Sequence, residues 1–383
     1  MKNIFGLSLG RGLVLPFFLL IFVVGAFAND GVFYVQGNNL VPLQETQVRL
    51  KKEVLRFYVT DFGWMRVDVD FTFVNPGKSK KVTVGFVTPP ASGDTDEEQH
   101  PQIKDFDVNV NGTDVKYQMK RMNETSFAGE KLGIESYDFV YYFPVTFKSG
   151  ENKIKHTYTY RGGASVETQR DFYYQITTGK RWANKQIDDF TLELHLDNGI
   201  YMIPASFWES GKLAQWKIVG DGVMKEEVES RFYDEDPRVR MVHLNSGYIT
   251  FQAKNFRPDR DITFAEPNWP AGWIGKWCIK GSNCVDSEAL EEITPYFRLN
   301  PWEGTTKEDL AQLSEQDLRL IRNFYYAVRG YQFKSDDLKS FYTKFFWYKP
   351  VEGLAAESIE LTPAEEKFVR LVMSAEAEKQ GKN

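Results

Sequence analysis

The chain has 383 residues, a length that fits two or three domains of ordinary size. It carries 47 Lys and Arg against 53 Asp and Glu, so its formal charge is −6 at pH 7, and no sustained basic stripe interrupts the mixture. This disfavours nucleic-acid binding, which needs a concentrated basic surface. We expect a mildly acidic protein with no nucleic-acid partner and no cofactor.

Residues 1–28 have the three parts of a secretory signal peptide. Lys2 and Arg11 supply positive charge, residues 13–24 are apolar, and residues 26–28 (Ala-Phe-Ala) form a small-x-small cleavage site. A retained membrane anchor is the alternative, but the apolar run is shorter than the roughly 20 residues needed to cross a bilayer. We therefore predict an exported protein, periplasmic or extracellular, with no membrane span after signal cleavage.

Residues 29–265 alternate apolar and polar side chains with a period of two, which is typical of strands with one buried face. The dipeptide Asn111-Gly112 lies between two such runs and predicts a hairpin. Many short strands without intervening helices indicate antiparallel β-sandwich structure. The Gly-rich segment near 162–168 is a candidate boundary between two such units. Examples of the alternating apolar positions are Val67, Val69, Phe71, Phe73, Phe190, Leu192, Leu194 and Leu196.

The composition changes after residue 265. Residues 266–305 are rich in Trp and Pro and form a predicted linker, whereas apolar residues in 306–383 recur at helical spacing. Ser314 is a predicted helix cap, and Gly330 lies where a glycine cap would end that helix. Two further helices are predicted, one after Ser335 and one opened by the capping box 362–365. The predicted fold class is therefore mainly β with a small C-terminal α domain.

Cys278 and Cys284 are the two cysteines of the chain, and residues 281–283 between them favour a turn. In an oxidising compartment this pair predicts one local disulfide. A metal site would need more ligands than two thiols, and a redox-active pair usually has the tighter C-x-x-C spacing. We therefore expect a structural disulfide within the linker and no metal.

The stretch 318–350 combines an aromatic-rich helical pattern with a fixed series of downstream residues. The residues that define it are Leu318, Arg319, Arg322, Asn323, Tyr326, Ala327, Gly330, Tyr331, Phe333, Leu338, Phe341, Trp347, Tyr348 and Pro350. With these residues the stretch resembles the YARHG domain of bacterial envelope and secreted proteins. The motif itself departs from the family, because Val328 and Arg329 stand where the family has Arg and His. The resemblance implies a small helical unit and names no reaction.

Three further features are the Asn29-Asp30 opening of the mature chain, the strand-like segment 52–55 and the later turn 178–182. In these features the mature chain is similar to an uncharacterised family of exported bacterial β-proteins. The similarity implies a sandwich and says nothing about activity.

Two groups of residues are candidate binding surfaces. In the YARHG-like unit, an aromatic and arginine-rich set would form a surface for an anionic or carbohydrate ligand, or would simply hold the helices together. In the linker, three Trp residues at four-residue spacing would form a platform for a glycan if exposed, or would pack the linker against the helical unit. The first set is Arg322, Tyr326, Arg329, Tyr331, Trp347 and Tyr348, and the second is Trp269, Trp273 and Trp277.

No catalytic residues are predicted. The sequence lacks the helical zinc-peptidase motif, the nucleophile elbow and the phosphate-binding loop, and its four His are scattered. The acidic loop 94–100 has carboxylates suited to Ca²⁺ but lacks the Gly turn and distal Glu of an EF-hand, so a solvated loop is favoured.

These patterns favour a non-enzymatic, exported bacterial envelope protein that acts as a binding or interaction module for an envelope protein or glycan. The alternative is an envelope hydrolase, or an accessory subunit of a peptidase or glycan-processing system, because YARHG-like units are found attached to peptidases.

Overall fold

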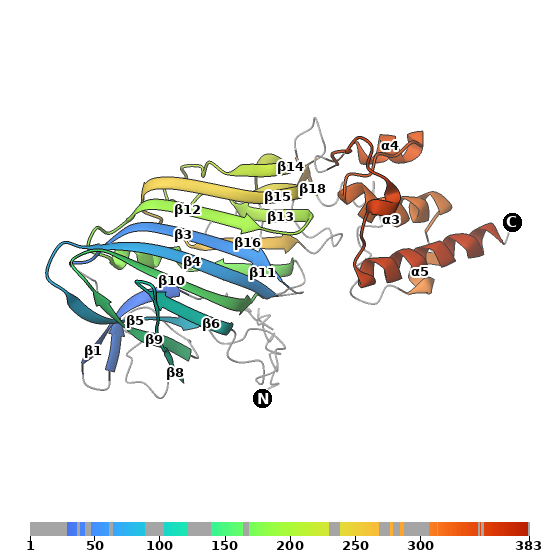
Figure 1. The fold of residues 1–383 in the computed structure, drawn as a ribbon. Coiled ribbons are helices and arrows are strands. Elements are labelled where there is room, and N and C mark those ends of the chain that lie inside the picture. Colours follow the sequence, from blue (N-terminus) through green and yellow to red (C-terminus); the bar gives the residue numbers. More distant parts are fainter. Residues whose placement is uncertain are drawn as a thin grey trace, which may run out of the picture.

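The computed structural model describes residues 29–36, 39–42, 47–60, 64–88, 103–121, 139–163, 168–229, 238–267, 276–278, 284–286, 306–311, 313–343, 345 and 348–381. The predicted signal peptide and the acidic loop 94–100 lie outside these residues. Up to residue 267 the described part consists mainly of strands, with one 3₁₀ helix, η4 (Ile176–Arg181), and helices dominate from residue 307 onward (Figure 1). The predicted fold class, mainly β with a C-terminal helical unit, is confirmed.

A strongly twisted sheet of 11 strands forms the frame of the β region (Figure 1). Its order is β11-β16-β13-β15-β12-β3-β4-β10-β6-β7, with β14 paired to β15. The long strand β15 connects the two halves of this frame, because it pairs with β13 along its first part and with β12 along its second. The strands are β3 (Arg49–Val59), β4 (Trp64–Asn75), β6 (Ile103–Val110), β7 (Thr113–Asp114), β10 (Gly150–Arg161), β11 (Thr168–Tyr174), β12 (Ile187–His195), β13 (Gly199–Pro204), β14 (Lys217–Glu229), β15 (Arg238–Phe256) and β16 (Ile262–Pro267).

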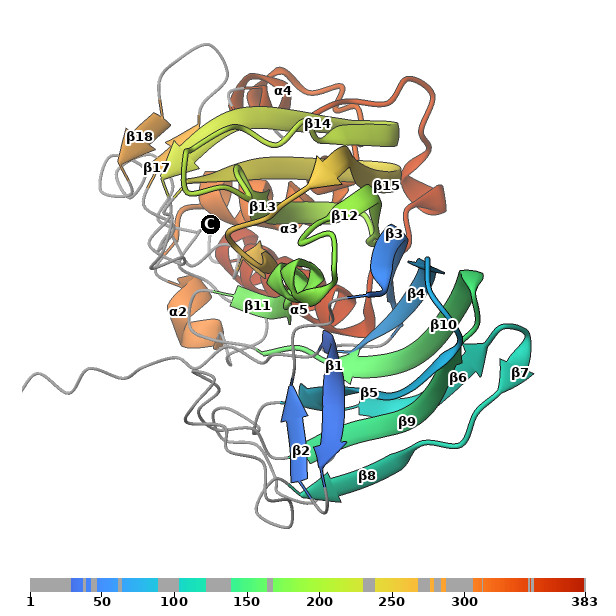
Figure 2. The same ribbon diagram turned by 90° about the vertical axis from the view of Figure 1, so that its left-hand side faces the viewer.

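A second sheet, in the order β2-β1-β5-β9-β8, packs against part of the first. Figure 2 shows this smaller layer below β4, β10 and β6. Aromatic residues fill the space between the layers: Phe73 of the large sheet lies 5.3 Å from Phe147 of the small sheet and 4.3 Å from Trp182, measured between ring centroids. The predicted sandwich is thus present. The strands of the second sheet are β1 (Asn29–Gln36), β2 (Asn39–Pro42), β5 (Lys80–Thr88), β8 (Gln118–Arg121) and β9 (Phe139–Phe147).

The candidate boundary near 162–168 does not separate two β units. Strand β12, which follows this segment, pairs in parallel with β3, which precedes it, so that His195 lies opposite Tyr58. Buried side chains from Val48 to Phe264 form one continuous core. The Gly-rich segment is therefore a connection within one sheet, and pairing between strands distant in sequence overrides the local signal.

The hairpin predicted at Asn111-Gly112 is confirmed. Asn111 and Gly112 have φ of 52° and 86°, which a two-residue turn of the mirror-image type requires at both positions. They connect β6 to β7, with Val110 opposite Thr113. The Asn109 side chain accepts a hydrogen bond from the Gly112 N–H at 2.8 Å and holds the turn closed.

The helical unit contains α2 (Lys307–Ala311), α3 (Glu315–Val328), α4 (Asp336–Tyr342), a short 3₁₀ turn η6 (Ala356–Ser358) and α5 (Pro363–Gln380). The predicted caps at Ser314 and Thr362 are both capping boxes, in which the cap side chain accepts from the third helical N–H and the third side chain accepts from the cap N–H. Ser335 precedes α4 as predicted. Helix α2 was not predicted, because it is short and lacks a clear apolar stripe.

Gly330 ends α3 in the left-handed conformation that the sequence predicts, with φ of 80°. Its N–H donates to the Ala327 carbonyl at 3.0 Å, and the Tyr331 N–H donates to the Tyr326 carbonyl at 2.9 Å. These two bonds form a Schellman cap, which satisfies carbonyls that the last turn would otherwise leave unpaired.

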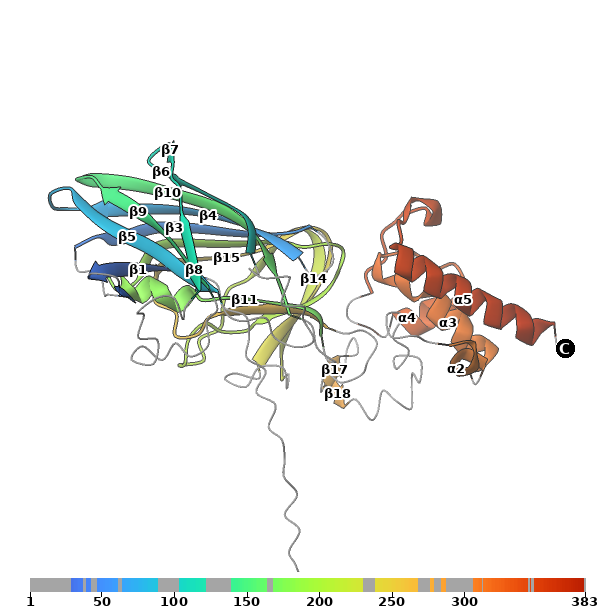
Figure 3. The same cartoon turned by 90° about the horizontal axis from the view of Figure 1, so that it is seen from below.

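The helical unit packs against the end of the large sheet formed by β13, β15 and β16 (Figures 1 and 3). Met202, Val239 and Ala265 from these strands share one buried cluster with residues of α2, α3, α4 and α5. At the rim of this contact Lys349 forms an ion pair with Asp221 of β14. Among the described residues, no helix is long and apolar enough to cross a bilayer.

Candidate functional site

Two arginine–glutamate pairs join α3 to α5. Arg329 Nη2 lies 2.7 Å from Glu365 Oε2, and Arg322 Nη1 lies 2.6 Å from Glu376 Oε2. The first pair is the more enclosed, with side chains 16% and 11% exposed. The same Glu365 oxygen accepts the N–H of Thr362, so Arg329 also reinforces the cap of α5. Both arginines of the predicted surface are therefore engaged in holding helices together.

Tyr331 lies in the turn that follows α3, and Tyr348 lies in the segment that follows α4. The buried Tyr348 hydroxyl donates to the Tyr331 carbonyl at 3.0 Å, and the Tyr348 ring stacks near Phe333, with centroids 6.1 Å apart. Burial raises the pKa of Tyr348, so this hydroxyl stays a donor at neutral pH. These contacts support a structural role. Trp347 lies outside the described residues.

Tyr326 is the member of the predicted surface that borders an open groove. The groove has a volume of about 560 Å³ and lies between the C-terminal part of α3, the segment after η6 and the first half of α5. This size falls within the range of ligand sites. Tyr326 was identified from the sequence, but its partners lie more than 30 positions further on, where no motif marks them. The lining residues are Tyr326, Ile359, Glu360, Leu361, Glu366, Val369 and Arg370.

The lining of the groove combines an aromatic and aliphatic wall with charged side chains at the solvent side. Val369 is buried, whereas Glu360, Glu366 and Arg370 are exposed. Arg370 Nη1 lies 3.0 Å from Glu366 Oε2 in an i,i+4 ion pair. Such a lining provides apolar contact and hydrogen-bonding groups to the same ligand, and it contains no arrangement of nucleophile and base.

A polar cluster lies where the helical unit meets the large sheet. Arg170 Nε lies 2.6 Å from Glu266 Oε2, and the Arg170 side chain is 10% exposed. Burial raises the pKa of Glu266; Arg170 opposes this shift, while the charges of Asp197 and Glu365 add to it. Glu365 belongs to α5, so its charge raises the pKa of Glu266 across the contact between the helical unit and the sheet. Each carboxylate is paired with its own arginine, so neither charge is left unpaired at the junction.

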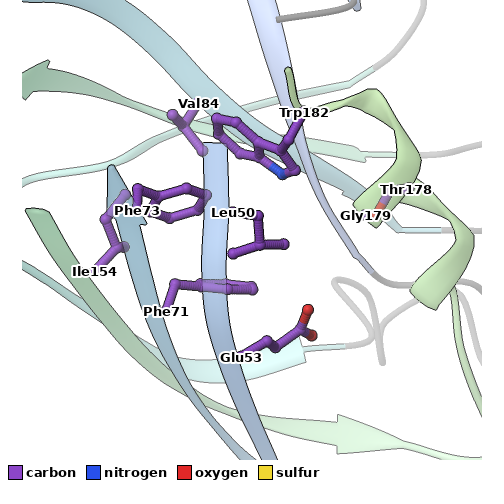
Figure 4. Close-up of a pocket in the computed structure, with 9 residues that line it drawn as sticks. All are labelled: Leu50, Glu53, Phe71, Phe73, Val84, Ile154, Thr178, Gly179 and Trp182. Carbon is purple, nitrogen blue, oxygen red and sulfur yellow. The ribbon is translucent and has the colours of Figure 1, made fainter. Parts of the chain in front are cut away.

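A small cavity inside the sandwich contains one ionisable group (Figure 4). Its volume of about 10 Å³ is enough for one water molecule. Glu53 is 3% exposed, and the hydroxyl of Tyr174 lies 3.4 Å from Glu53 Oε1. The other lining residues shown in Figure 4 are mainly apolar, including Phe71, Phe73 and Trp182. The cavity is too small and too enclosed to admit a substrate.

The charges on the open face of the large sheet are paired with one another. Arg56 lies between Asp70 and Glu193, at 2.9 Å and 3.2 Å. His195 is stacked between Tyr58 and Tyr248, with centroids 4.5 Å from each. The charges of Arg56, Asp70 and Glu193 and both faces of the His195 ring are therefore already engaged. Within the described ranges, no group of three or more His, Cys, Asp and Glu is arranged to hold a metal.

Comparison with known families identifies the unit that contains this groove. Residues 299–377 match the YARHG domain. The predicted resemblance of the C-terminal third is thereby confirmed. A search of curated proteins finds no match to this chain.

Solved structures that are similar to the chain share little sequence with it. A Legionella pneumophila protein provisionally described as nutrient-binding is 19% identical, with a TM-score of 0.47, and the match covers 92% of this chain and 98% of that one. Leukotriene A4 hydrolase from Saccharomyces cerevisiae is 9% identical, with a TM-score of 0.28 and coverage of 59% and 31%. An M1 zinc metallopeptidase from Deinococcus radiodurans is 12% identical, with a TM-score of 0.26 and coverage of 88% and 64%. The chain thus spans less than two thirds of either enzyme's length.

The linker before the YARHG domain is described only in two short strands, β17 (Lys276–Cys278) and β18 (Cys284–Asp286). These strands pair antiparallel, with Cys278 directly opposite Cys284. Residues opposite each other in such a pair have Cα atoms within the range that a disulfide spans. The bond itself stays a prediction, because the two side chains lie outside the described part. Trp269, Trp273 and the Trp277 side chain are outside it as well.

Proposed function

We propose that the protein is an exported, non-enzymatic component of the bacterial envelope whose YARHG domain binds a glycan in the groove beside Tyr326. The observation that carries this proposal is the composition of the groove. A sugar ring has an apolar face and a rim of hydroxyl groups, and aromatic and charged side chains together suit both.

The surrounding structure supports a site held in a fixed shape. Tyr326 lies on α3 and Val369 on α5, and the ion pairs Arg329–Glu365 and Arg322–Glu376 fix these two helices relative to each other. A site on rigid elements loses little conformational freedom when a ligand binds. The β region would then present the YARHG domain at the envelope, which agrees with the predicted export signal.

Binding of the full mature chain to insoluble peptidoglycan, chitin, chitosan and cellulose tests this proposal. We expect retention on at least one glycan, and a loss of at least about fivefold in affinity for Tyr326→Ala, because an aromatic contact contributes about 1 kcal/mol. The matched control is Lys367→Gln, since Lys367 is exposed on α5 but does not line the groove.

Circular dichroism must show that each variant is folded. If no glycan is retained, or if Tyr326→Ala binds as well as Lys367→Gln, the groove is not a glycan site.

A further inference from the structure

The negative and positive side chains that line the groove do not balance each other. Glu366 and Arg370 compensate each other through their ion pair. Glu360 is exposed and has no hydrogen-bond or ion-pair partner among the described residues. One carboxylate of the groove that Tyr326 lines therefore remains uncompensated, so the lining carries an excess of negative charge.

We propose that the ligand of this groove is a glycan with free amino groups, that is, a polymer containing amino sugars without N-acetyl groups. This inference rests on the proposed function and specifies its ligand. The protonated amine would donate hydrogen bonds to the Glu360 carboxylate, and the sugar ring would lie against Tyr326 and Leu361. A cation near the Tyr326 ring would also gain from the negative face of its π system.

Other ligand classes fit the groove less well. An anionic polymer would be repelled by Glu360 and Glu366, and the one cation of the lining, Arg370, is already paired. A fully acetylated glycan would contact the apolar wall but would leave Glu360 bound only to water. A lysine-bearing peptide would provide the ammonium group without the apolar face of a sugar ring, which the wall of the groove suits.

The test compares three fluorescently labelled ligands on the full mature chain at about pH 5.5, where carboxylates are ionised and amines are protonated. They are a glucosamine oligosaccharide, an N-acetylglucosamine oligosaccharide of equal length and a lysine-containing peptide of equal charge. We expect the glucosamine oligosaccharide to bind about three- to tenfold more tightly than its acetylated counterpart, as an exposed ion pair with a cation–π contribution would give. Added salt should reduce this preference.

Glu360→Gln should remove the preference for the free amine while leaving binding of the acetylated sugar unchanged. Glu352→Gln is the matched control, because Glu352 is exposed in the same domain and does not line the groove. Its preference should equal that of the wild type.

The remaining outcomes contradict either the amine assignment alone or glycan binding as a whole. If both sugars bind equally, or if Glu360→Gln keeps the preference, the amine assignment is wrong and glycan binding stands. If the lysine peptide binds more tightly than the glucosamine oligosaccharide, the source of the amine is a peptide and the inference fails. If neither sugar binds, the proposed function fails together with the inference.

Discussion

Replacing Gly330 tests whether the cap of α3 holds the YARHG domain together. Two effects make a side chain at this position unfavourable for the folded state. Its φ of 80° is unfavourable for any L-residue by about 1–2 kcal/mol, and more so for a β-branched one. A Cβ there would also lie 2.9 Å from the carbonyl oxygen of Lys349 and 2.9 Å from a methyl of Val351. That contact would strain the 2.8 Å hydrogen bond from the Val351 N–H to the Gly330 carbonyl.

Comparison with Gly353 distinguishes the backbone cost from the cost of the close contact. Gly353 has a similar φ of 77°, but a Cβ there would meet nothing within 4 Å. Gly353→Ala should therefore cost about 1 kcal/mol from the backbone alone, and Gly330→Ala about 2–3 kcal/mol. Gly330→Val should cost about 3–4 kcal/mol, because branching at Cβ adds to both terms.

Hydrogen exchange followed by mass spectrometry on the full chain measures this effect locally. Gly330→Val should speed the exchange of amides in α3 and α5 and leave those of β4 and β10 nearly unchanged, because the domain opens without the sandwich. Equal costs for the two alanine variants would show that the contact with Lys349 is unimportant. Unchanged exchange in α3 for Gly330→Val would refute the account of the cap.

Three further predictions concern charge and redox state. Arg329→Met should lower the free energy of unfolding of the YARHG domain by about 2–3 kcal/mol, because it leaves the enclosed Glu365 without its guanidinium; an unchanged denaturation midpoint in urea would contradict this. The raised pKa of Glu266 means that the folded state holds this proton more tightly than the unfolded state, so its contribution to stability is complete below the ordinary pKa of 4.5 and is lost as pH rises through the folded value. In Glu266→Gln, the free energy of unfolding should fall less steeply above pH 4.5 than it does in the wild type. If the variant and the wild type show the same dependence of stability on pH, Glu266 is not the group responsible. Thiol labelling of the unfolded, unreduced protein should modify neither Cys278 nor Cys284, and two labels per chain would exclude the disulfide.

The sequence alone predicted the helix caps and turns, because each of these structures depends on residues that are close together in the chain. The caps at Ser314 and Thr362 and the turn at Asn111-Gly112 depend on a side chain or a missing Cβ beside the backbone groups concerned. The same holds for Gly330, where the end of α3 follows from positions 326–331. Alternating hydrophobicity likewise predicted strands packed into a sandwich, because each residue's face is set by its immediate neighbours.

Tertiary structure alone decided which distant segments meet. The parallel pairing of β3 with β12 joins residues on both sides of an expected boundary, and no local pattern encodes that partnership. The groove likewise needs Tyr326 from α3 beside Glu360 and Arg370, which the chain brings together only when α5 packs along α3. The resemblance to the YARHG domain therefore pointed to Tyr326 on one wall of the groove. The shape of the groove and its unbalanced charge arise from long-range packing, whose energy depends on complementary surfaces rather than on adjacent residues.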